Sequence, residues 1–161
     1  MKKAQGGIIF VLLLFIVIIV LFGIFNIIGY KIHTDLTADI LPDLELNESK
    51  EVINDVTNSY PSVFDGLAVF IMIGIWVVGI AAGFMYDEHP MLFGFMILIC
   101  IACLIAGMFL SNSFDEFIAD DEYAVTATSF PKTTWIIGHL LEVGIMMMLS
   151  VIAAAMAKNK I

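Results

Sequence analysis

A histidine and a glutamate lie three residues apart in the last apolar stretch of the chain, where ionisable groups are costly. His139 and Glu142 share one face of the helix predicted over residues 134–157. Counted from Thr134 at about 1.5 Å per residue, Glu142 is expected on the order of 12 Å deep, near the middle of a membrane. A charge at that depth needs a partner. The pair could form a proton or cation relay, supply two ligands of a metal site, or simply fix the register of the helix through a hydrogen bond, which is the interpretation we favour.

The remaining reactive side chains do not assemble into a catalytic or metal-binding set. Cys100 and Cys103 form a C-x-x-C inside an apolar helix, where thiolates are disfavoured and packing is the expected role. A metal site needs three or four ligands, so no metal and no cofactor is expected. The sequence has no G-x-S-x-G, no H-E-x-x-H and no phosphate-binding glycine loop. It therefore predicts no enzyme, and at most a non-catalytic subunit of a membrane enzyme complex.

A short acidic segment before the last apolar stretch mixes carboxylates with aromatic side chains. It lacks the ligand spacing and the glycine of an EF-hand loop, so we expect a surface for a protein partner. The residues of this predicted partner surface are Asp115, Glu116, Phe117, Asp120, Asp121 and Glu122.

Composition and run length decide which elements carry these residues. The 161 residues are 61% hydrophobic and 14% charged, with a mean hydropathy of +1.01, so lipid and not water is the main solvent. About 20 apolar residues cross a bilayer. The sequence predicts a single-domain, all-α integral membrane protein over residues 1–161, with four transmembrane helices at approximately 6–29, 66–86, 91–110 and 134–157.

The first large loop is predicted to contain a short amphipathic helix. Apolar residues recur there at helical spacing from Val52 to Tyr60, Asn47 or Ser49 would cap the helix, and Pro61 would end it. Asp65, at the interface end of the second predicted span, is expected to act as a cap.

Charge is segregated by side. Thirteen of the sixteen acidic residues lie in the predicted loops 30–65 and 111–133, which four crossings place on one face, with the termini and the turn at residues 87–90 on the other. Four lysines near the termini against three on the loop face favour cytoplasmic termini, or termini inside a virion, with the large loops outside. With no arginine and a net charge of −9, the chain has no footprint for nucleic acid or for anionic lipid.

Small residues at four-residue spacing predict close packing between the spans. Gly79 and Gly83 form such a pair in the second span, and Ala102 and Ala106 form another in the third. These pairs favour a compact bundle over four separate anchors.

Taken together, these features favour a non-catalytic structural or accessory subunit of a larger membrane-embedded assembly. A multi-subunit membrane complex and a virion that contains a membrane fit equally, with the lipid bilayer and other subunits or copies of the chain as partners. The first alternative is an oligomeric channel, holin-like pore or proton pathway that uses His139 and Glu142. The second alternative is a metal-binding membrane subunit.

Overall fold

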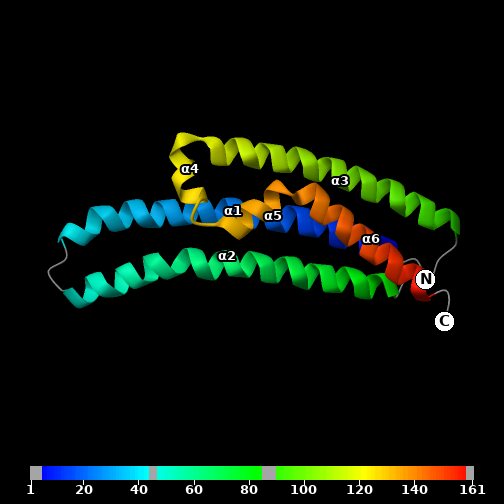
Figure 1. Cartoon of the computed structure of the whole chain (residues 1–161), viewed down its shortest axis with the longest axis horizontal. Helices are drawn as coiled ribbons and strands as arrows, with labels where there is room; N and C mark the ends of the chain where they lie inside the picture. The colour runs from blue at the N-terminus through cyan, green and yellow to red at the C-terminus, as the bar shows by residue number, and fades with distance from the viewer. Residues whose placement is uncertain (1–4, 44–46, 85–89, 159–161) are drawn as a thin grey trace.

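Long α-helices make up nearly all of the structure, a computed structural model that describes residues 5–43, 47–84 and 90–158 (Figure 1). A single turn of 3-10 helix, Leu41–Asp43, follows the first helix. In chain order, the α-helices are α1 (Gln5–Ile40), α2 (Asn47–Phe84), α3 (Pro90–Ala119), α4 (Asp121–Ala127), α5 (Pro131–Gly138) and α6 (Leu140–Lys158). The described residues contain no strand.

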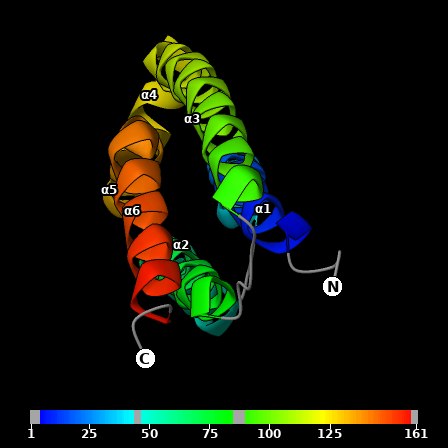
Figure 2. The same ribbon diagram turned by 90° about the vertical axis from the view of Figure 1, so that its right-hand side faces the viewer.

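Four of the helices, α1, α2, α3 and α6, are long and apolar enough to cross a membrane. This confirms the predicted fold class, an all-α protein with four candidate spans. Helices α1 and α6 each pack against both α2 and α3, and Figure 2, which looks along the bundle, shows the four around a common axis. The predicted turn at residues 87–90 lies outside the described residues except for Pro90, which begins α3. The last two residues of the second predicted span, 85 and 86, also lie outside them.

The two large segments predicted as loops are mostly helical. Helix α1 continues through residues 30–40, and α3 continues to Ala119. The prediction that Pro61 ends a separate amphipathic helix is wrong, because Pro61 lies inside α2. A proline within a helix costs about 3 kcal/mol. Packing of the surrounding turns offsets this cost: Tyr60 and Phe64 stack on each other at 4.2 Å, and Tyr60 also stacks on Tyr30 of α1 at 5.5 Å.

The first two helices therefore extend well past the bilayer thickness. At 1.5 Å per residue, the 36 residues of α1 span about 54 Å, against about 30 Å of hydrocarbon. Residues 31–40 of α1 and 47–60 of α2, which we name the arm, run beyond α4 to one end of the molecule (Figure 1). Helix α6 ends at the opposite end. Within the arm, His33 Nε2 lies 2.9 Å from Thr57 Oγ1, whose proton goes to the Ile53 carbonyl oxygen, so His33 is the donor.

The core lies where α5 meets α1 and α3. Its fully buried side chains come from these three helices, from the first residue of α6 and from the segment just before α5. Gly23 permits this approach, because a Cβ at that position would collide with Ile137 of α5 and lie 3.2 Å from Thr133. The largest of these buried side chains are Phe15, Phe114, Phe130, Ile19, Ile27, Ile136, Ile137 and Leu140.

Candidate functional site at the α5–α6 break

The fourth predicted span is interrupted between α5 and α6. His139 separates the two helices with φ −112° and ψ 30°, outside the helical region. Its N–H still reaches the Trp135 carbonyl oxygen at 3.0 Å, and its own carbonyl oxygen accepts from Val143 N at 3.0 Å. The chain thus bends at one residue while these two backbone bonds are kept. The uninterrupted helix predicted over residues 134–157 is to that extent wrong.

The inner side of the break is held by α3. Ser111 is buried, and its hydroxyl donates to the Ile137 carbonyl oxygen at 2.7 Å. A break of this kind leaves helical carbonyls without their amide donors, and a buried carbonyl needs a partner. On the C-terminal side of the break, α6 packs closely against α3: a Cβ on Gly144 would meet the Leu104 side chain at 2.5 Å. Ser111 is therefore the side chain that makes the bend tolerable in an apolar core.

The other end of α5 is held by α2. Asp65 is 3% exposed, and its carboxylate accepts from Thr133 N at 2.7 Å and from Lys132 N at 3.1 Å. The residue before α5 is Phe130, which has no side-chain oxygen to cap the first turn. Asp65 supplies that cap from another helix, and its negative charge also suits the positive end of α5. Asp65 acts as a cap, but for a helix that begins more than sixty residues later in the chain. We name the two hydrogen bonds from Lys132 N and Thr133 N to the Asp65 carboxylate the clasp.

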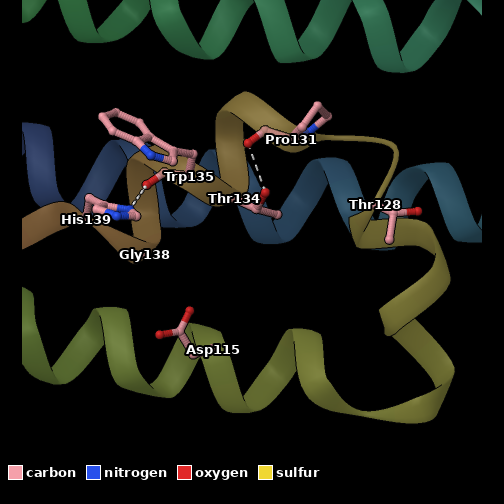
Figure 3. Close-up of a pocket in the computed structure, with 7 residues that line it drawn as sticks. All are labelled: Asp115, Thr128, Pro131, Thr134, Trp135, Gly138 and His139. Carbon is pink, nitrogen blue, oxygen red and sulfur yellow. Dashed lines mark hydrogen bonds between the residues drawn. The ribbon is translucent and has the colours of Figure 1, made fainter.

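His139 is oriented by its own backbone and points outward. Its Nδ1 lies 2.9 Å from the Trp135 carbonyl oxygen, and its ring stacks on the indole of Trp135 at 4.7 Å (Figure 3). A carbonyl oxygen only accepts, so Nδ1 carries the proton and a neutral ring keeps its lone pair on Nε2. Such an arrangement orients a histidine as a proton acceptor or as a metal ligand.

Glu142 lies on the same outward face, one turn further on. Residues 140–157 of α6 are by themselves one of the four candidate spans, and Glu142 lies in the first turn of that helix. The depth near the middle of the membrane stays a prediction, because Thr134, from which it was counted, lies in α5 and the break at His139 separates it from Glu142. Both His139 and Glu142 are exposed, and the hydrogen bonds and ion pairs of the described residues include none between them.

A shallow cavity of about 480 Å³ opens beside the break. Figure 3 shows Trp135 and His139 on one side and Asp115 of α3 on the other. The threonine hydroxyls of the wall already donate to backbone carbonyls, so Asp115 and His139 are the polar groups left to meet a ligand or a proton. The lining residues are Asp115, Thr128, Pro131, Thr134, Trp135, Gly138 and His139.

The predicted small-residue pairs divide between the inside and the outside of the bundle. Gly79 and Gly83 are buried, and a Cβ on Gly83 would lie 2.6 Å from the Val151 carbonyl oxygen of α6. Ala102 and Ala106 are exposed on the outer face of α3. Within the chain, α3 packs through the residues one position further on, Cys103 and Gly107, because successive positions differ by about 100° around a helix.

The predicted acidic partner surface forms the turn from α3 into α4. Asp120 caps α4 by accepting from Glu122 N at 2.9 Å, and Phe117 packs on Tyr123 at 4.5 Å. Glu122 lies 3.8 Å from Lys31 of α1. Asp115, Glu116 and Asp121 are exposed. Half of this surface therefore serves the fold, which leaves the other half available to a partner.

Metal-ligating side chains are scattered in the described part of the chain. No group of three or more His, Cys, Asp or Glu residues there could hold a metal ion. Cys100 and Cys103 are buried free thiols in the α3 core, as their predicted packing role requires.

Two residues of the site, Ser111 and Thr133, were missed by sequence reasoning. A signal for the clasp does exist, since Pro131 marks a helix start whose preceding residue, Phe130, cannot cap it. That pattern indicates that the cap of α5 comes from another part of the chain, but it does not identify the residue that supplies it.

The chain matches no protein-family model, no curated protein and no solved structure. Its function is accordingly argued from geometry.

Proposed function

We propose that this protein is a non-catalytic subunit of a membrane-embedded assembly and that its arm binds a protein partner outside the bilayer. The observation that supports the proposal is an apolar stripe on the arm. Ile32, Leu36 and Ile40 recur every four residues along α1 and are 54%, 54% and 48% exposed. They lie beyond the span predicted for residues 6–29, in a part of α1 that we propose projects out of the lipid into water, although the candidate span of the structure runs to Ile40.

The stripe offers useful binding energy. Full burial of one such side chain is worth about 1.5–3 kcal/mol, so covering the exposed half of all three would contribute on the order of 3 kcal/mol. The α2 side of the arm also presents Val52 and Val56, which are 63% and 49% exposed. Apolar side chains gathered in this way on a water-facing helix pair are typical of a protein contact.

The charge of the arm indicates what kind of partner would fit. The arm carries five acidic residues against two lysines, Lys31 and Lys50. Two arms of the same charge would repel each other, whereas a partner with an apolar centre and a basic rim would be attracted and oriented. The acidic residues of the arm are Asp35, Asp39, Glu48, Glu51 and Asp55.

Site-specific photocrosslinking in the native membrane tests this proposal. A photoreactive residue at Leu36 is expected to capture one protein of defined mass. Ala38 is exposed on the same helix but lies about 200° around its axis from Leu36, so it is the matched control and is expected to capture little. Equal capture at both positions, or capture of lipid alone, would contradict a partner on the stripe. A crosslinked product of twice the chain mass would show that the stripe binds a second copy of this chain, and not a basic partner.

A second candidate function is a proton pathway along the outward face of α6. It is favoured by the lone pair on His139 Nε2 and by the exposed Glu142 carboxylate one turn away. Oligomerisation around this face would bring the two groups of several chains together, and imidazole and carboxylate are the usual members of a proton relay.

Proton flux into liposomes separates this candidate from the first. Glu142→Gln is expected to abolish flux, while Glu116→Gln, which changes an exposed acid of α3, leaves it intact. Flux that Glu142→Gln does not change, or no flux in the unchanged protein, would remove this candidate without affecting the first.

A further inference from the structure

A second cavity, of about 390 Å³, lies between α2 and α5, on the clasp side of the molecule. Its wall is almost wholly apolar. The volume is within the range of small-molecule sites. The lining residues are Val69, Met72, Pro131, Lys132, Trp135 and Ile136.

The clasp fixes how this cavity is placed along the candidate span. Asp65 binds the backbone of Lys132, so the start of α5 and residue 65 of α2 lie at the same level. Val69 and Met72 lie about 6 and 10 Å further along α2, in the direction of its most apolar part. The cavity therefore has a polar mouth where the charged segments begin and an apolar floor within the span.

Lys132 is the one charged residue among those that line this cavity. Lys132 is exposed, and the ion pairs of the described residues involve only Lys31. The Asp65 carboxylate, which accepts from the backbone amide of Lys132, is buried and directed at the amides of α5. Trp135 is 55% exposed beside it, an amphipathic ring of the kind that lies at the headgroup level.

We propose that this cavity binds an anionic phospholipid, with its phosphate on Lys132 and one acyl chain against Val69, Met72 and Ile136. A lipid fits better than a peptide, because the floor lies in a span where acyl chains are the surrounding solvent and the wall offers no backbone or side-chain acceptor for a peptide. The net charge of −9 predicts no attraction to an anionic membrane surface as a whole. Net charge does not govern one exposed lysine that forms none of the ion pairs of the described residues.

Lipid retention measured by native mass spectrometry tests the site. The full-length protein is to be taken from nanodiscs that contain equal amounts of phosphatidylglycerol and phosphatidylcholine. One phosphatidylglycerol per chain is expected to remain bound in preference to phosphatidylcholine. Lys132→Gln should lower that preference about fivefold, the contribution of one basic residue near an anionic surface. Lys132→Arg should retain it, and Lys50→Gln, on the arm, is the matched control.

Three outcomes would overturn the proposal: equal retention of both lipids, undiminished retention in Lys132→Gln, or an equal loss in Lys50→Gln. Val69→Phe gives a second arm that keeps the charge and fills the floor. It is expected to reduce retention of phosphatidylglycerol with Lys132 in place, and unchanged retention would show that the cavity is not where the lipid lies. If a protein that copurifies from the native membrane protects Lys132 from amine labelling and lipid does not, the occupant is a protein and the proposal fails.

Discussion

The two ends of α5 are built differently. At its N-terminus the Asp65 carboxylate accepts from two backbone amides, those of Lys132 and Thr133, although the buried Thr133 hydroxyl has no hydrogen-bond partner. At its C-terminus only the inner side is closed, by Ser111, while His139 points outward with Nε2 unused. Buried polar groups that are fully paired stabilise and specify a fold. Polar groups that are held in one orientation but left exposed are the ones available for chemistry or binding.

The largest expected effect of a substitution is at the clasp. Asp65→Ala leaves two amides of α5 without an acceptor, one of them fully buried, so the free energy of unfolding should fall by about 2–3 kcal/mol. Unfolding in mixed micelles measures this. Asp35→Ala removes an exposed acid paired with Lys31 at 3.1 Å and should cost about 0.5 kcal/mol or less. Equal losses in the two variants would show that the clasp is no stronger than a surface pair.

A smaller loss is expected on the inner side of the break. Ser111→Ala removes the hydroxyl that donates to the Ile137 carbonyl oxygen, and the unpaired carbonyl should cost about 1–2 kcal/mol in the same assay. Ser113→Ala, at an exposed position two residues further along α3, is the control. If Ser111→Ala were as stable as the unchanged protein, the bend would not depend on this bond.

The smallest effect on stability is expected on the outer side. His139→Ala removes an exposed ring and its bond to the Trp135 carbonyl oxygen, for a change of about 0.5 kcal/mol. The free energy of unfolding should therefore follow the order Asp65→Ala, Ser111→Ala, His139→Ala. A loss at His139 comparable with that at Asp65 would make the histidine structural and would erase the difference between the two ends of α5.

Sequence reasoning succeeded where a property depends on neighbouring residues. The four apolar runs correctly predicted four candidate spans, and Pro131 and Pro90 both occupy the helix starts that proline favours. It failed at Pro61 and at His139. A helix continues through Pro61 because aromatic packing against α1 offsets the lost hydrogen bond. The helix breaks at His139, directly after Gly138, a residue type that often ends helices, and a serine on another helix donates to the Ile137 carbonyl there.

The site itself was predictable only in its residue types. His139 and Glu142 were singled out because ionisable groups are rare in apolar runs, and the structure keeps them on one outward face. Their depth was not predictable, since it depends on where α5 ends and α6 begins. Ala102 and Ala106 show the same limit at a finer scale, because one position of helical rotation decides whether a small residue faces a neighbouring helix or the outside.

The sequence by itself determined that this chain is a set of apolar helices with acidic segments between them, because the length of an apolar run and the position of a charge are local properties. The tertiary structure decided which polar groups are satisfied. Asp65 and Lys132 are separated by 67 positions and meet only because α5 folds back onto α2. The Asp65 carboxylate is used by the fold, whereas the exposed side chains of Lys132 and His139 are not buried by it.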